Sequence, residues 1–254
     1  MKRYLALILS ALFIAMCFCG CAKDDVGIDD DKYIEPDEII EETVVEQPEN
    51  SLYKPYIKAI VDKNKKNKDA KSYGVLYDVD SNDTDELIML YYSDKVKDPS
   101  TKITGPSVAY GIYTVVFGGV VPLEEDHFLF PMAGGPSGCV YILENPEETY
   151  LAFRYCEKNP GEEDSLVCLG NWYIYTLDGI ELELAKNCEY QYVYTTEADE
   201  EIIDYANSTV TINGEKGSYQ QFQVWLDTFE TTEILAYSDE YEESSLKNLL
   251  GSLE

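Results

Sequence analysis

The spacing of apolar side chains changes from helical to strand-like near Ser72. Within Ser51–Asn64, Tyr53 and Ile57 recur on one helical face, and Pro55 falls in the first turn, where a helix tolerates it. From Ser72 onward the period becomes two, which indicates half-buried strands. We expect strands over Ser72–Val79, Glu86–Tyr92, Val108–Phe117, His127–Met132, Cys139–Leu143, Tyr150–Cys156, Leu166–Leu177, Ile180–Leu184 and Glu189–Thr195.

Turn residues separate these strands. Asp178-Gly179 is a strong signal for a two-residue hairpin turn. Because no long helix lies between the strands, the pattern predicts an antiparallel meander and not a doubly wound sheet. The 22 tyrosines agree with a sheet that has one wet face, since Tyr is amphipathic and favours half-buried strands.

Helical spacing returns after the meander. We expect a short helix over Thr196–Ala206, a small hairpin at Asn213-Gly214 and a helix capped by Ser218. An apolar stripe within Leu246–Leu253 predicts a terminal helix that docks or frays. The expected fold class is therefore α+β, with an N-terminal helix, a Tyr-rich antiparallel β meander and C-terminal helices.

The first twenty residues have the parts of an export signal. Lys2 and Arg3 supply a positive start, and Leu5–Met16 is an apolar run. A spanning helix needs about 20 apolar residues, so this run is typical of a signal peptide. Gly20 follows, and Cys21 comes directly after it.

This ending resembles the lipobox of bacterial lipoproteins, in which a small residue precedes a lipidated Cys. Gly20 fits the pattern, whereas Phe18 stands where Leu is usual. The resemblance implies that Cys21 receives a diacylglycerol thioether, becomes the mature N-terminus and ties the exported chain by acyl chains to the outer face of the cytoplasmic membrane. An ordinary secretory signal cut nearby is the alternative.

Composition divides the chain into four parts. Residues 1–20 are the expected signal peptide, and residues 21–50 are the lipidated Cys and an acidic tether that has too few large apolar residues to fold. Residues 51–237 form the expected α+β globular domain. Residues 238–254 form a C-terminal amphipathic helix or tail.

Acidic residues dominate the surface that we expect. The formal net charge is −30, from 49 acidic and 19 basic residues. Such a surface repels phosphate backbones, so the sequence argues against nucleic acid as a partner. The acidity either keeps a surface protein soluble or serves to bind cations and basic partners.

One loop carries a pattern of metal ligands. In YDVDSNDTDELIMLYY, starting at Tyr77, oxygen-bearing residues recur at alternate positions, as in loops that wrap Ca²⁺ in oxygen ligands. Position 6 is Asp83 where such loops usually have Gly, and position 12 is Met89 where an EF-hand has Glu. An acidic turn without metal is the alternative. The candidate Ca²⁺ ligands are Asp78, Asp80, Asn82, Thr84 (through its carbonyl) and Glu86.

The strands around this loop resemble the context of FG-GAP-type calcium loops, in which the acid stands at position 9, where Glu86 lies. The wider chain resembles a family of uncharacterised lipoproteins of Gram-positive gut bacteria, which share a strand–DxDxDGxxEL–strand unit, a Tyr-rich meander and a late Asn-Gly hairpin before a helix. The matching pieces are Tyr73–Met89, the meander to Thr195 and Thr211–Phe229, about two-thirds of the chain. The resemblance implies no known enzymatic activity.

Four cysteines fall in the globular part. Cys156 and Cys168 flank a turn and could face each other across a hairpin, which would leave Cys139 and Cys188 as a second pair. Free thiols are the alternative. No CxxC spacing exists and His127 is the only histidine, so the sequence argues against zinc.

Aromatic side chains suggest a ligand surface. Tyr190, Tyr192 and Tyr194 share one face of a strand, because residues two apart point the same way. If exposed, this ladder would suit a protein or carbohydrate ligand. A sheet face covered by a helix is the alternative.

Catalytic patterns are weaker. Glu124-Glu125-Asp126 and Glu147-Glu148 could supply the paired acids of a glycoside hydrolase, although such pairs arise by chance in a chain this acidic. Cys139 with His127 has the residue types of a nucleophile and base, but the preceding glycines indicate a turn entering a strand. We expect a monomeric cell-surface lipoprotein that acts as a binding or structural module, with an extracellular hydrolase or an accessory subunit of a membrane complex as alternatives.

Overall fold

The fold is mostly β. The computed structural model describes residues 49–65, 67, 70–98, 105–131, 137–161, 165–197 and 200–253. A four-stranded antiparallel sheet has the order β1-β2-β3-β4. Its strands are β1 (Ser72–Tyr77), β2 (Glu86–Ser93), β3 (Ser107–Val116) and β4 (Gly119–Pro131).

A larger antiparallel sheet of seven strands has the order β10-β9-β8-β7-β6-β5-β11. Neighbours in the sequence pair from β5 to β10, and the late strand β11 returns to pair with β5. The strands are β5 (Ser137–Glu144), β6 (Thr149–Pro160), β7 (Leu166–Asp178), β8 (Glu181–Glu197), β9 (Glu200–Ile212), β10 (Glu215–Gly217) and β11 (Glu230–Ala236).

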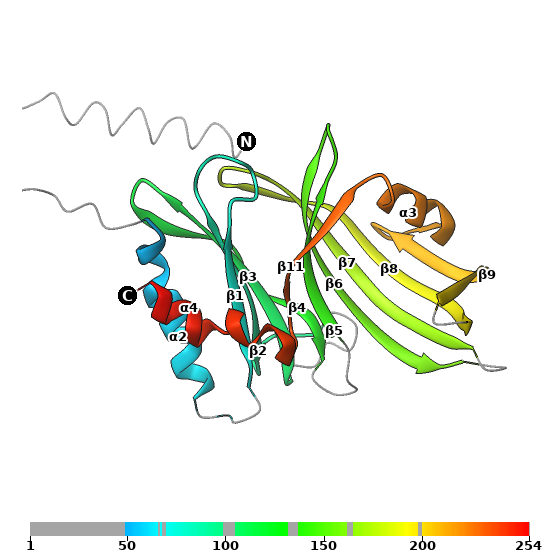
Figure 1. Cartoon of the computed structure of the whole chain (residues 1–254), viewed down its shortest axis with the longest axis horizontal. Helices are drawn as coiled ribbons and strands as arrows, with labels where there is room; N and C mark the ends of the chain where they lie inside the picture. The colour runs from blue at the N-terminus through cyan, green and yellow to red at the C-terminus, as the bar shows by residue number, and fades with distance from the viewer. Residues whose placement is uncertain are drawn as a thin grey trace, which may run out of the picture. The chain divides into compact units, whose positions relative to one another are not determined.

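Short helices cover the outer faces of the two sheets (Figure 1). Ser218 caps α3 by accepting the backbone N–H of Gln221, as expected from the sequence. None of the helices in the described residues has the length and apolarity needed to cross a membrane. The helical segments are η1 (Glu49–Tyr53), α2 (Lys54–Asn64), α3 (Tyr219–Leu226), η2 (Asp239–Ser244) and α4 (Leu246–Ser252).

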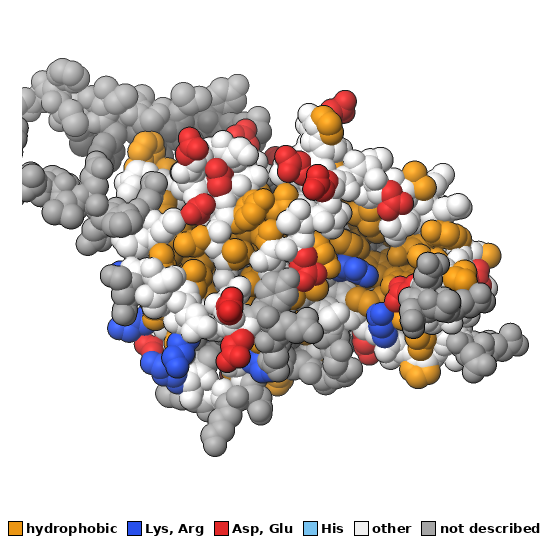
Figure 2. Space-filling view, in the orientation of Figure 1, with side chains coloured by type: hydrophobic (Ala, Val, Ile, Leu, Met, Phe, Trp, Pro, Cys, Tyr) orange, Lys and Arg blue, Asp and Glu red, His pale blue; other side chains and the backbone are white. Residues whose placement is uncertain are grey.

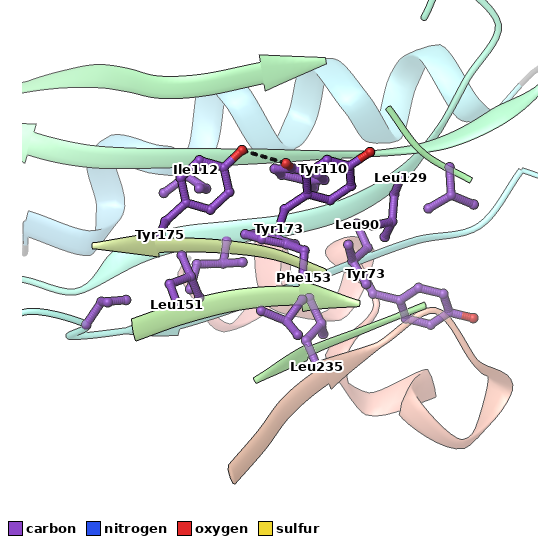
Figure 3. Packing of buried hydrophobic residues seen from close by; sticks show 14 of the residues in the cluster. Tyr73, Leu90, Tyr110, Ile112, Leu129, Leu151, Phe153, Tyr173, Tyr175 and Leu235 are labelled. Atoms are coloured by element: carbon purple, nitrogen blue, oxygen red, sulfur yellow. Dashed lines mark hydrogen bonds between the residues drawn. The ribbon is translucent and has the colours of Figure 1, made fainter. Parts of the chain in front are cut away.

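The two sheets pack face to face around an apolar core (Figure 3). The Tyr110 ring of β3 stacks on the Phe153 ring of β6, with centroids 3.9 Å apart. The hydroxyls of Tyr110 and Tyr175 are 2.7 Å apart and share a hydrogen bond. Rings and aliphatic side chains from both sheets therefore join them into one core, as in sandwiches.

Helices bury the remaining face of each sheet. The helices α2 and α4 cover the four-stranded sheet around Ile57, Leu246 and Met89, all fully buried. On the seven-stranded sheet, Tyr219 and Phe222 of α3 lie against the opposite face from Tyr110. Nearly every residue of β2 and β3 is buried because both faces of these strands are covered.

The helix expected over Thr196–Ala206 is wrong. This segment contains the end of β8 and the start of β9, where Tyr194 pairs with Ile203 and Thr195 pairs with Ile202. The β-branched isoleucines favour a strand, and cross-strand pairing with β8 outweighs the local helical spacing. The expected strands also missed β11 and the first half of β4.

Candidate metal centre

The loop between β1 and β2 winds around the carboxylate of Asp78. Its Oδ1 accepts the backbone N–H of Asn82 and its Oδ2 that of Asp83, each at 3.0 Å. Ser81 and Asp83 have φ of 59° and 67°, in the left-handed region that is costly for residues other than Gly. Asp83 thus has the backbone conformation that calcium loops usually assign to Gly.

We expect Asp83→Gly to stabilise the protein. Removing the side chain at a left-handed φ should raise the free energy of unfolding by about 0.5–1 kcal/mol. Urea denaturation measures the change. Asp62→Gly in helix α2 is the matched control and should lower stability instead, because Gly is a poor helix former. A loss of stability at residue 83 would contradict the strain argument.

Asp80 links the loop to the other sheet. Its Oδ2 accepts the backbone N–H of Gly179 at 2.6 Å, and Gly179 lies in the turn between β7 and β8. Its Oδ1 is buried and has no hydrogen-bond partner among the described residues. A buried carboxylate oxygen without a partner is costly, so a cation beside it would be stabilising.

Glu86 is the fully buried member of the group. It is the first residue of β2, where its Oε2 accepts the N–H of Val79 at 2.9 Å and its Oε1 accepts the hydroxyl of Thr114 at 3.0 Å. Burial raises the pKa of Glu86 to about 7, and these two hydrogen bonds oppose the rise. Acceptor contacts at both oxygens suit the ionised carboxylate.

The structure brings Asp78, Asp80 and Glu86 together. Each offers a carboxylate oxygen, and these oxygens lie within 4.8 Å of one another. The three residues thus form an acidic group that could hold a metal ion. Carboxylate oxygens without His or Cys suit hard cations such as Ca²⁺ and Mg²⁺.

The other two predicted ligands take part in the loop's own hydrogen bonds. The amide nitrogen of Asn82 donates to Asp80 Oδ2 at 3.0 Å, and its Oδ1 accepts the N–H of Thr84 at 2.8 Å. Asn82 would have to turn its amide to present oxygen to an ion. The sequence pattern found the three acids but gave no sign of the contributions from Thr114 on β3 and Gly179 in the β7–β8 turn, which are distant in the sequence.

The loop also contacts the N-terminal helical segment. Asp85 Oδ2 accepts the side-chain amide of Asn50 at 2.9 Å, and the Asp85 carbonyl accepts the Tyr53 hydroxyl at 2.7 Å. Together with the Gly179 contact, this places the loop where η1, the four-stranded sheet and the seven-stranded sheet meet. Order in the loop is therefore linked to the packing of all three.

A disulfide joins Cys156 of β6 to Cys168 of β7, the pairing considered across the hairpin. Cys139 and Cys188 are free. The second disulfide considered from the sequence, between Cys139 and Cys188, is wrong. These residues lie in one row across the sheet, Cys139–Arg154–Trp172–Cys188, with two strands between them. Three strand spacings of about 4.8 Å keep their sulfurs far apart.

The three tyrosines of the proposed ligand face are buried. Tyr190, Tyr192 and Tyr194 are 5%, 5% and 2% exposed. Tyr219 of α3 stacks on Tyr192 with ring centroids 5.2 Å apart. The prediction of an exposed ligand face at these tyrosines is wrong, because α3 covers this face of the sheet.

The residues considered for catalysis are dispersed. Cys139 and His127 lie on opposite sides of the seven-stranded sheet, since His127 packs on Tyr173 in the inter-sheet core and Cys139 shares the other face with Trp172. Burial raises the pKa of the Cys139 thiol to about 11, which disfavours a thiolate nucleophile.

The paired acids also have other partners. Glu125 accepts the Tyr113 hydroxyl at 3.0 Å, and Glu148 lies in the exposed turn whose N–H groups are capped by Asn145. Four cavities are formed by the described residues, and each is lined by a single acidic residue. None of these four cavities therefore has the two carboxylates that a glycoside hydrolase needs on either side of a sugar.

Comparison of the chain with protein-family models, curated proteins and solved structures gives no match. Cys21 and the lipobox-like segment lie outside the described residues.

Proposed function

We propose that the chain is a lipid-anchored cell-surface protein, a binding or structural module in which Ca²⁺ orders the loop between β1 and β2. The main support for this proposal is the carboxylate of Asp80. One of its oxygens accepts the N–H of Gly179, and the other is buried without a hydrogen-bond partner among the described residues. Ca²⁺ at this oxygen, held also by Asp78 and Glu86, would offset the buried charge. The ion would then stabilise the junction between the two sheets.

Calcium suits the site better than magnesium. Ca²⁺ accepts six to eight oxygens in flexible geometry, whereas Mg²⁺ demands a near-ideal octahedron and keeps its waters. Here the ligands sit on a wound loop and on the first residue of a strand, so their spacing can adjust only in part. An affinity on the order of 10⁻⁴–10⁻³ M is expected, which suffices outside a cell.

Calorimetric titration of the full chain in detergent tests the site. We expect saturable Ca²⁺ binding, weaker Mg²⁺ binding, and no binding by Asp78→Ala/Asp80→Ala. At Ca²⁺ ten times above the dissociation constant, the free energy of unfolding should rise by about 1.4 kcal/mol.

Asp204→Ala is the matched control for this titration. Asp204 also accepts backbone N–H groups, from Ala206 and Asn207 where the register of β9 against β8 is irregular, but belongs to no acidic group in the described residues. It should bind Ca²⁺ like the unaltered protein. Equal heats from the unaltered protein and the double variant would overturn the calcium proposal.

The membrane anchor is supported by the lipobox-like ending at Cys21 and by the acidic, apolar-poor stretch that follows it. We expect Cys21→Ser to lose acylation and to leave the membrane fraction or retain its signal segment. Mass spectrometry of the N-terminus and cell fractionation measure this. Normal membrane retention of the variant, without added acyl mass in the parent, would contradict the anchor and leave the calcium proposal intact.

A further inference from the structure

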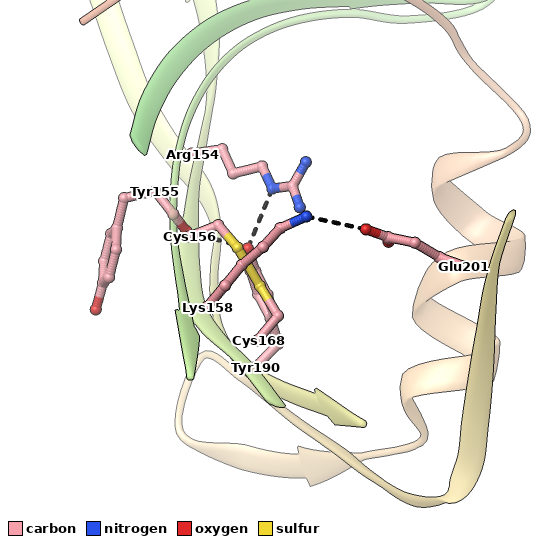
Figure 4. The surroundings of a disulfide bond; sticks show 7 residues. All are labelled: Arg154, Tyr155, Cys156, Lys158, Cys168, Tyr190 and Glu201. Atoms are coloured by element: carbon pink, nitrogen blue, oxygen red, sulfur yellow. Dashed lines mark hydrogen bonds and ion pairs between the residues drawn. A yellow bond between two sulfur atoms is a disulfide. The ribbon is translucent and has the colours of Figure 1, made fainter. Parts of the chain in front are cut away.

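Arg154 occupies an unusual position for a charged residue. It lies in the middle of β6, between Phe153 of the inter-sheet core and Tyr155. Its register partners are Cys139 and Trp172, so it points to the face that α3 covers. In Figure 4 its side chain extends to the same side of β6 as that of Lys158, while Tyr155 extends to the other.

Aromatic groups hold the guanidinium of Arg154 in place. Its Nε donates to the Tyr190 hydroxyl at 3.1 Å, and that hydroxyl donates to the Tyr155 carbonyl at 3.0 Å. The guanidinium carbon lies 5.3 Å from the Trp172 ring centroid and 5.9 Å from that of Tyr190. The side chain is thereby fixed by its Nε and by ring faces.

The guanidinium of Arg154 forms no ion pair with any acidic residue in the described part of the chain. The neighbouring Lys158 is paired with Glu201 at 2.9 Å. Guanidinium is always charged, and a partly buried charge without a counter-ion is costly. A carboxylate is the group whose flat pair of oxygens fits the Nη fork.

Cavities lie on both sides of this arginine. Each has a volume of about 230 Å³, and both are lined by Arg154 and Tyr141. Trp172 and Tyr219 line one of them, and Tyr192 lines the other. Figure 2 shows basic side chains among apolar ones over the seven-stranded sheet. The hollow thus combines a fixed cation with aromatic walls.

We propose that this hollow binds a small organic carboxylate, with its carboxylate on the Nη groups of Arg154 and an apolar or aromatic body against Tyr141 and Trp172. The volume of each cavity suits a small molecule with one ring better than a segment of a partner protein. Each cavity also has one acid in its wall, Glu201 or Asp227, which repels a doubly charged anion such as phosphate more strongly than a singly charged carboxylate.

The inference deepens the binding-module reading of the proposed function and does not require the calcium site. The test is titration of the full chain in detergent with benzoate, followed by the fluorescence of Trp172 in a Trp225→Phe background. We expect saturable quenching or enhancement by benzoate. Benzamide, which has the same shape without the charge, and inorganic phosphate should each bind at least about tenfold more weakly.

Arg154→Gln should weaken benzoate binding about tenfold or more, since a charge-assisted bidentate contact is lost. Lys186→Gln is the matched control: Lys186 also lies over a Trp ring, 4.8 Å from the centroid of Trp225, but lines neither cavity. The control is made in the same Trp225→Phe background, where residue 225 still carries an aromatic ring for Lys186. It should bind benzoate normally. If Arg154→Gln does not fold, Arg154→Lys should still weaken binding severalfold, because Lys lacks the fork.

Equal binding of benzoate and benzamide, tighter binding of phosphate, or unchanged affinity in the arginine variants would each overturn the proposal. Absence of any benzoate response would do the same. The Asp78→Ala/Asp80→Ala variant is expected to bind benzoate like the parent. The calcium site and the carboxylate pocket can therefore fail separately.

Discussion

Tyr110→Ala should lower the free energy of unfolding by about 3–5 kcal/mol, the largest effect that we expect from a single substitution. Tyr110 is fully buried between the two sheets and stacks on Phe153. Its loss would leave a cavity where the sheets meet and would remove the partner of the Tyr175 hydroxyl. Folded domains are stable by only about 5–15 kcal/mol, so much of the total would be lost.

Urea denaturation of the unaltered protein and of Tyr110→Ala measures this effect, and Tyr110→Phe is the control. Phe keeps the ring but leaves the Tyr175 hydroxyl without its partner, so the cost should fall to about 1–3 kcal/mol. A cost below about 1 kcal/mol for the alanine variant would show that the sheets do not pack through this ring.

Gly170→Ala should also lower the free energy of unfolding markedly. The Tyr190 side chain crosses over Gly170 to reach Arg154, and an added Cβ would collide with the Tyr155 carbonyl oxygen and with the Tyr190 ring. Backbone atoms cannot yield cheaply, so we expect a loss of about 1–3 kcal/mol in the free energy of unfolding.

Gly217→Ala gives the comparison for this glycine. Gly217 lies in the exposed strand β10, where a Cβ would come no closer than 3.3 Å to another residue. Its substitution should change stability by less than about 0.5 kcal/mol. Displacement of Tyr190 should also weaken benzoate binding in Gly170→Ala alone. Similar stability for the two glycine variants would contradict the close packing at Gly170.

Local signals predicted much of the fold. The helix that ends at Asn64, the turns at Asp178-Gly179 and Asn213-Gly214, and the Ser218 cap all depend on nearby residues and are present in the structure. Each of the strands β1 to β8 also overlaps a strand expected from the sequence, although burial does not alternate along β2 and β3.

The arrangement of the layers depends on pairing between distant segments. The strand β11 exists because it pairs with β5, which precedes it by about ninety residues along the chain. The segment that starts β9 has helical spacing but gains strand partners from β8. No local pattern reports which face α3 covers, so the burial of Tyr190 and its neighbours could not be read from their alternation.

The candidate sites differ in the same way. Asp78, Asp80 and Glu86 lie within nine residues, so their convergence could be predicted from spacing. The contact of Asp80 with Gly179 spans 99 residues and could not. Arg154 was also missed, although one signal was available: it is one of two arginines in the chain, the other being Arg3, and it stands inside an apolar strand.

A crystal structure grown in millimolar CaCl₂ tests the calcium account most directly. We expect an ion with carboxylate oxygens of Asp78, Asp80 and Glu86 about 2.3–2.6 Å away, and with the free Oδ1 of Asp80 among them. An ordered loop that holds only water at this position, in the presence of calcium, would contradict it.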